Sequence, residues 1–103
     1  MRQAFDEAEC GMLAEFFALF GNRTRLRIFC ALQEGRKTVS ELADYAKVSL
    51  PNASQHLRLM RDKGILASRR AGHTIYYHLT DCALKESCHI IRSATKDAAA
   101  VRR

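Results

Sequence analysis

The stretch TVSELADYAKVSLPNASQHLRLMRDKG, residues 38–64, contains two apolar repeats of helical spacing separated by a short break. The first repeat predicts a short helix over residues 39–46, because its apolar residues fall on one face. Ser49 and Pro51 then suit the cap and the first turn of a second helix, which ends at Gly64. Two short helices joined by a tight turn form a helix-turn-helix.

The second of these helices has one apolar and one polar face. We expect the apolar stripe to be buried; its members are Leu50, Ala53, Leu57 and Met60. The opposite face carries side chains that can read base edges in the major groove or contact phosphates: Asn52, Ser54, Gln55, His56, Arg58 and Arg61. Residues at the two helix starts complete the predicted DNA-contact set: Thr38, Ser40, Ser49 and Pro51. This face predicts a recognition helix.

The period changes from helical to alternating in ILASRRAGHTIYYHL, residues 65–79. Alternation on both sides of a glycine predicts a β-hairpin with Ile75, Tyr77 and Leu79 on one face, and we place its tip at residues 69–73. A basic hairpin directly after a helix-turn-helix is a wing. Its cationic side chains are expected to reach backbone phosphates or the minor groove: Arg69, Arg70 and His73.

Further helices are predicted on both sides of this unit. Residues 4–20 form a helix with a wide apolar face, and Gly21 ends it. The next helix begins after Asn22 and stops at Gly35. Its inward residues are Leu26, Ile28, Phe29 and Leu32, and its exposed face carries Arg23, Arg25 and Arg27. Asp81 caps a last helix over roughly residues 82–98. The fold is therefore mainly α with a small β-hairpin, a winged helix-turn-helix in the order α-α-α-α-β-β-α, in one domain over residues 1–103.

Composition and charge narrow the function. The chain of 103 residues is 48% apolar and 27% charged, which is typical of a globular domain. Its net charge of +6 is concentrated in residues 21–80, which carry eleven basic and four acidic groups, and this favours a polyanionic partner such as nucleic acid. The N-terminus does not resemble a signal peptide and no run is long enough to span a membrane, so we expect a cytoplasmic protein with no membrane partner.

Residues 19–81 resemble the ArsR/SmtB family of bacterial winged-helix repressors. The resemblance is carried by four stretches: LFGNRTRLRI at the start of the second predicted helix, the VSELA helix, the SQHLRLMRDKGIL recognition helix and the RRAGHTIYYHL wing. It implies a homodimer built on the first and last helices, and double-stranded operator DNA that an inducer releases. The apolar helix 4–20 fits that role independently, because a small monomer cannot hide so many phenylalanines. Two-fold symmetry then predicts a pseudo-palindromic operator.

The resemblance leaves the inducer open. Arsenite sensors of the family carry a cysteine pair where this chain has TVSELADYA, and zinc sensors carry Asp-x-His where it has Asp81 and Ala83, so both metal sites are absent or incomplete. The candidate sensing thiols are Cys10, Cys30, Cys82 and Cys88. Redox-responsive relatives pair a thiol at the position of Cys30 with one in the last helix, for which Cys88 is the candidate. Cys82 and Cys88 from two chains could instead bind a thiophilic ion such as As(III).

Each cysteine also has a purely structural interpretation, because cysteine is often a small buried residue. For Cys30, core packing and sensing are both open. No cofactor is assigned beyond a thiophilic metal or metalloid ion as inducer. No pairing of nucleophile and base is present, so an enzyme is not expected. The alternatives to an inducible repressor are a constitutive repressor and a winged-helix protein-interaction module.

Overall fold

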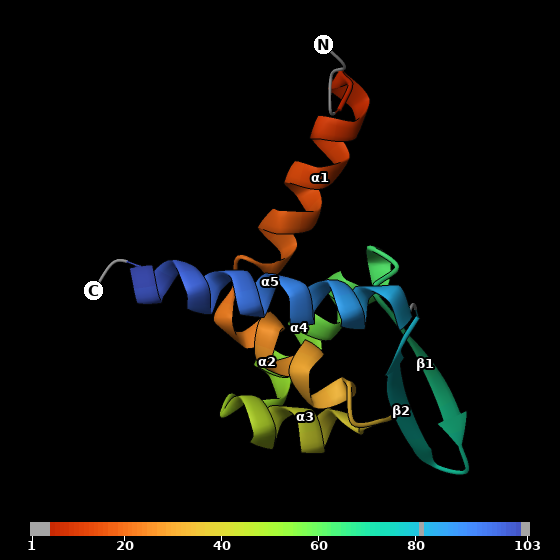
Figure 1. Cartoon of the computed structure of the whole chain (residues 1–103). Helices are drawn as coiled ribbons and strands as arrows, with labels where there is room; N and C mark the ends of the chain where they lie inside the picture. The colour runs from red at the N-terminus through yellow and green to blue at the C-terminus, as the bar shows by residue number, and fades with distance from the viewer. Residues whose placement is uncertain (1–4, 81, 102–103) are drawn as a thin grey trace.

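The computed structural model describes residues 5–80 and 82–101, with the side chains of the last helix described from residue 89 to residue 100. Five helices and one hairpin follow one another along the chain (Figure 1). Their bounds are α1 Glu7–Phe20, α2 Arg23–Leu32, α3 Val39–Ala46, α4 Leu50–Asp62, β1 Leu66–Ala71, β2 Thr74–Leu79 and α5 Cys82–Val101. The predicted fold class and element order are confirmed.

Residues with short polar side chains fix where α2, α3 and α4 begin. The Asn22 side chain accepts a hydrogen bond from the Arg25 backbone N–H at 3.0 Å and so caps α2. Thr38 and Glu41 form a reciprocal capping box at the start of α3. The Ser49 hydroxyl oxygen accepts from the Asn52 N–H at 3.2 Å, with Pro51 in the first turn of α4. These caps set the register in which each helix presents its faces.

The turn between α3 and α4 is tight because one residue adopts a left-handed conformation. Lys47 has φ 59° and ψ 47°, and it ends α3. Its neighbour Val48 donates its backbone N–H to the Ala43 carbonyl at 3.0 Å, which closes the turn. The chain therefore reverses between the two helices without a loop, as the sequence predicts.

The core lies where α2, α3, α4 and the base of the hairpin meet. Its largest fully buried side chains are Phe29, Ile28, Leu42, Leu57, Met60 and Leu66. Two leucines predicted to be buried are not: Leu26 of α2 is 46% exposed and Leu50 of α4 is 50% exposed. Leu50 occupies the first turn of α4, where the helix extends past the core, and Leu26 faces α1 and α5 rather than α3.

The hairpin is an antiparallel pair in which Leu66 lies opposite Leu79 and Ala71 opposite Thr74. The turn falls at Gly72 and His73, so Arg69 and Arg70 belong to β1 and not to the tip, which corrects the prediction. The hairpin is tied to the body at two places. Lys37 pairs with Tyr77 through two backbone hydrogen bonds of 3.0 and 2.8 Å, and Thr80 donates to the Gly64 and Ile65 carbonyls in the turn between α4 and β1.

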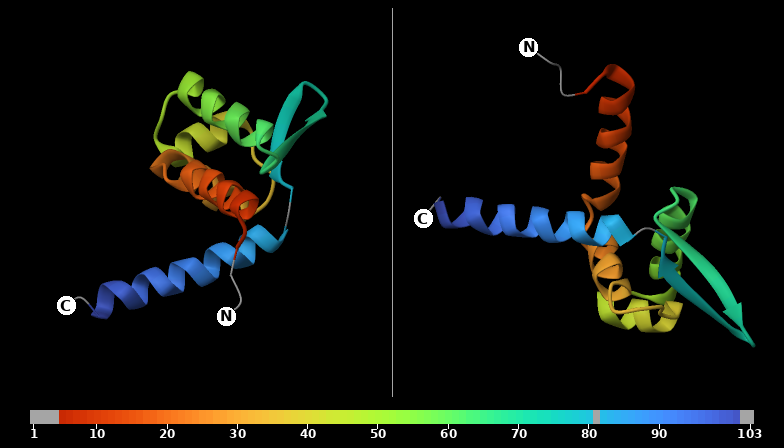
Figure 2. Two further views of the ribbon diagram at one scale, coloured as in Figure 1. Left: turned by 90° about the horizontal axis from the view of Figure 1, so that it is seen from above. Right: turned by 45° about the vertical axis from the view of Figure 1, so that its right-hand side comes forward.

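Helices α1 and α5 extend away from the helix-turn-helix body and the wing, as the right-hand view in Figure 2 shows. The radius of gyration is 15.7 Å, against about 13 Å expected for a compact domain of this size. The prediction that Asp81 caps α5 falls outside the described residues. Among the described residues, no helix is both long and apolar enough to cross a membrane.

Candidate nucleic-acid interface

One face of α4 is polar and open to solvent along its length. The exposed side chains on it are Asn52, Ser54, Gln55, Arg58 and Arg61. The opposite face is anchored by Ala53, Leu57 and Met60, each of which has no exposed surface. Because these three side chains are fully buried, the polar face is held in one orientation relative to the body. Side-chain amides and guanidinium groups so held can form bidentate contacts to base edges.

Further residues of the predicted DNA-contact set lie at the starts of α3 and α4. The hydroxyl oxygens of Thr38 and Ser49 accept the capping hydrogen bonds, which leaves each hydroxyl proton available to donate. Ser40 and Pro51 are exposed. The Thr38 backbone N–H, and secondarily its hydroxyl, hold the pKa of the Glu41 carboxyl below its usual value, so Glu41 remains ionised in its capping role.

His56 differs from its neighbours on α4 because it is turned toward α2. It is half-buried, and its Nδ1 lies 3.3 Å from Nη1 of Arg25. Burial, and secondarily the Arg25 charge, lower the pKa of the His56 imidazole. The prediction that His56 is presented with the exposed polar residues is therefore corrected: it links the recognition helix to α2.

Arg25 is also not on an exposed face, contrary to the prediction. Its Nε donates to the Leu19 carbonyl and its Nη2 approaches the Ala18 carbonyl at 3.5 Å, while Nη1 contacts His56. One guanidinium thus joins the last turn of α1, the start of α2 and the middle of α4. The sequence held no signal for this role, because the carbonyls belong to a helix end that only the fold brings nearby.

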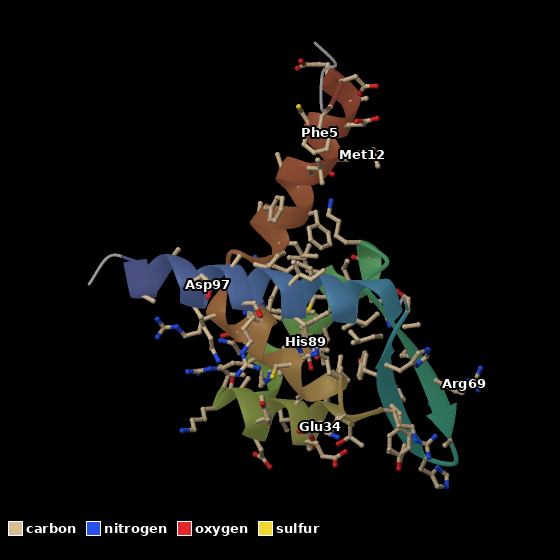
Figure 3. The ribbon with its side chains drawn as sticks, viewed as in Figure 1. Phe5, Met12, Glu34, Arg69, His89 and Asp97 are labelled. Atoms are coloured by element: carbon tan, nitrogen blue, oxygen red, sulfur yellow. The ribbon has the colours of Figure 1, made fainter. Side chains whose placement is uncertain are left out.

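The wing adds cationic side chains at one end of α4. Arg69, Arg70 and His73 are exposed. Figure 3 shows Arg69 pointing from β1 away from the helices. None of the arginines of α4 or β1 forms an ion pair within the described part of the chain, where Lys37 with Glu34 at 3.9 Å is the one such pair. Their charge is therefore free to act on an external polyanion.

The candidate sensing cysteines are only partly described. Cys30 is exposed on α2, and the Tyr45 hydroxyl of α3 donates to its Sγ at 3.4 Å, which raises the pKa of Tyr45. The core-packing interpretation of Cys30 is therefore wrong for this chain. Cys10 is exposed near the start of α1. The side chains of Cys82 and Cys88 lie outside the described residues. Across the described side chains, no three His, Cys, Asp or Glu residues are grouped to hold a metal ion.

Comparison with known proteins places these features in a family. Residues 22–68, from the cap of α2 into β1, match the family described as "Bacterial regulatory protein, arsR family". The "Transcriptional repressor SmtB homolog" of Synechocystis sp. is 36% identical over 78 residues, which are 76% of this chain and 58% of that protein. The "Uncharacterized HTH-type transcriptional regulator MJ1325" of Methanocaldococcus jannaschii is 34% identical over 79 residues, 76% of this chain and 89% of that protein.

The fold agrees with these sequence matches. The crystal structure of M. tuberculosis Rv0081 superposes with a TM-score of 0.87 at 28% identity, covering 94% of this chain and 98% of that one. The chain spans little more than half the length of the SmtB homolog, and nearly all of MJ1325. On these matches, the chain belongs to the ArsR/SmtB family of winged-helix transcriptional repressors.

Proposed function

We propose that the protein is a homodimeric transcriptional repressor that places α4 in the major groove of operator DNA and its wing over the adjacent minor groove. The observation that carries this proposal is the solvent-exposed polar face of α4, held by the fully buried side chains of Ala53, Leu57 and Met60 and flanked by unpaired arginines of the wing. Gln55 and Asn52 are assigned to base edges, and the arginines mainly to phosphates.

Apolar side chains left open on α1 and α5 support dimerisation through these helices. Met12 and Ile90 are each 70% exposed, and Phe17 is 57% exposed; Figure 3 shows Met12 on the projecting part of α1. A groove of about 400 Å³ between α1, α2 and α5 is lined mainly by Phe16, Phe17, Phe20, Leu26 and Ile91. A second copy is the occupant proposed for this surface, because burying it from water is favourable.

Charge adds to this case for a dimer. The first turns of α1 carry acidic side chains, Glu7 and Glu9, whereas Arg92 and Lys96 of α5 border the apolar groove. A two-fold dimer in which the start of α1 packs against α5 of the other copy would bring these opposite charges together. The same symmetry makes the operator pseudo-palindromic.

The inducer is proposed to act on thiols. Cys30 is open to reagents, and it lies on α2, the helix whose Arg25 contacts the recognition helix. Modification of its sulfur, or its ligation to a thiophilic ion such as As(III), removes the hydrogen bond from Tyr45 and changes the packing of α2 against α3. An inducer of this kind weakens operator binding only if it binds the non-operator conformation better.

The test is operator binding by reduced protein, measured by fluorescence anisotropy on DNA from the chain's own upstream region. The expected result is tight, sequence-dependent binding that As(III), Zn(II), peroxide or polysulfide weakens. Cys30→Ser should lose the response, and Cys10→Ser, which removes the other exposed thiol among the described residues, should keep it if Cys30 is the sensor. Absence of sequence-specific binding would favour a protein-interaction module. Binding that none of these agents changes would identify a constitutive repressor.

A further inference from the structure

A hollow of about 240 Å³ lies against the wing, outside the proposed contacts of α4. It is lined by Arg36, Arg69, Tyr76 and His78. These residues come from three separate segments: the turn before α3, strand β1 and strand β2. We call this set the wing pocket.

The register of the hairpin explains why these side chains meet. Arg69 lies directly opposite Tyr76, and His78 is two residues further along β2 on the same face. The other face carries Leu66 and Tyr77, which pack on the core. The wing pocket is therefore on the outer face of the hairpin, away from the helices, where Figure 3 shows Arg69.

Arg36 joins the pocket because the chain before α3 pairs with β2. The Lys37–Tyr77 backbone hydrogen bonds bring Arg36 beside Tyr76, and its guanidinium carbon lies 4.1 Å from the centroid of that ring. Such stacking is attractive and holds the planar guanidinium in one place. The stacking on Tyr76 therefore keeps the Arg36 guanidinium beside the hollow instead of leaving it to move freely in solvent.

The wing pocket is cationic and has no internal counterion. Neither Arg36 nor Arg69 forms an ion pair within the described residues, and no carboxylate lines the hollow. Two guanidinium groups present planar sets of N–H donors that match the oxygens of a phosphate. The imidazole of His78 and the hydroxyl of Tyr76 add further donors.

We propose that the wing pocket binds a phosphate group. One source is the operator backbone: Arg70 projects from the opposite face of β1, so a wing lying over a minor groove about 6 Å wide offers cations to both strands. Binding of the operator backbone rests on the proposed function. The other source is a free phosphate or a phosphorylated small molecule, and its binding does not depend on the proposed function.

The DNA source is tested by the salt dependence of operator binding for Arg36→Gln and Arg69→Gln. Each variant is expected to bind about three- to tenfold more weakly, and to reduce the slope of log K against log salt by about 1. Arg36→Lys keeps the charge and should recover part of the slope. Arg23→Gln is the matched control, because it removes one exposed charge outside the wing.

The free-phosphate source is tested by NMR titration of the wild-type chain with inorganic phosphate and pyrophosphate, without DNA. Saturable shifts of wing amides that the Arg36→Gln/Arg69→Gln double variant loses would assign the pocket to a free ligand. The proposal is overturned if the variants keep the wild-type affinity and slope and the wild type shows no such shifts. A wild type that binds no DNA would refute the proposed function alone, since the titration still decides whether the pocket binds phosphate.

Discussion

Replacing Arg25 by glutamine removes a guanidinium that joins three helices. Its Nε donates to the Leu19 carbonyl at the end of α1, and its Nη1 contacts His56 of α4 at 3.3 Å. Glutamine keeps part of the aliphatic stem but cannot reach both partners, because it lacks the forked donor geometry. We therefore expect Arg25→Gln to weaken both the packing of α1 on α2 and the contact that holds α4 against α2.

The size of the effect follows from these contacts. A partly buried hydrogen bond from a charged donor contributes about 1.5–3 kcal/mol, and the contact with His56 adds about 1 kcal/mol. The third contact, from Nη2 to the Ala18 carbonyl, is 3.5 Å long and adds little. The sum is roughly 2–4 kcal/mol of unfolding free energy, which for a domain of this size lowers Tm by on the order of 10–20 °C.

The assay is thermal unfolding followed by circular dichroism at one fixed protein concentration, because the proposed dimerisation would make Tm depend on concentration. Arg23→Gln is the matched control, since Arg23 is exposed on the same helix and its removal changes the net charge equally. If Arg25→Gln melts within about 2 °C of Arg23→Gln, the three-helix contact contributes little and the reasoning is refuted.

Four further predictions concern the recognition helix, the wing and the proposed dimer. Because the pKa of His56 is lowered from 6.5 in the folded state, unfolded chains bind more protons, and stability falls as pH drops below about 6.5 toward the lowered value. His56→Gln should flatten the fall in Tm between about pH 7.5 and about pH 5.5, and an unchanged profile would contradict this. Gln55→Ala should cost about 1–3 kcal/mol of discrimination between operator and mutated operator in anisotropy titrations, and equal losses on both would refute base reading. Arg70→Ala should weaken binding to all sequences alike and reduce the salt slope by about 1, whereas a loss confined to the operator would reassign it to a base. Phe17→Glu should shift the chain from dimer to monomer in sedimentation, and a dimer of unchanged affinity would place the interface elsewhere.

Local sequence signals predicted the helix-turn-helix and the wing because each acts over a few residues. The caps at Asn22, Thr38 and Ser49 bond to backbone N–H groups three residues away, so their role is visible in the sequence. Alternation also gave the two faces of the hairpin, with Tyr77 packed on the core. The predicted tip, residues 69–73, contained the turn at Gly72 and His73 but was too wide, because the backbone register extends β1 to Ala71.

Burial at the edges of the body was harder to predict. Leu26 and Leu50 fit apolar helical spacing, but Leu50 lies where α4 extends past the core, and Leu26 faces the groove between α1 and α5. Periodicity reports which face is apolar and not how far the core extends along the helix. The same limit applies to Cys30, whose spacing fits either a core or a surface position and which the fold leaves exposed.

The order of elements, the polar face of α4 and the basic character of its surroundings could be predicted from the sequence, because they depend on periodicity, capping and composition. The roles of Arg25 and Arg36 became visible only once the chain was folded. Arg25 meets carbonyls of α1 and an imidazole of α4, and Arg36 meets a ring of β2. A long cationic side chain has no fixed partner until the fold places acceptors or an aromatic face within its reach.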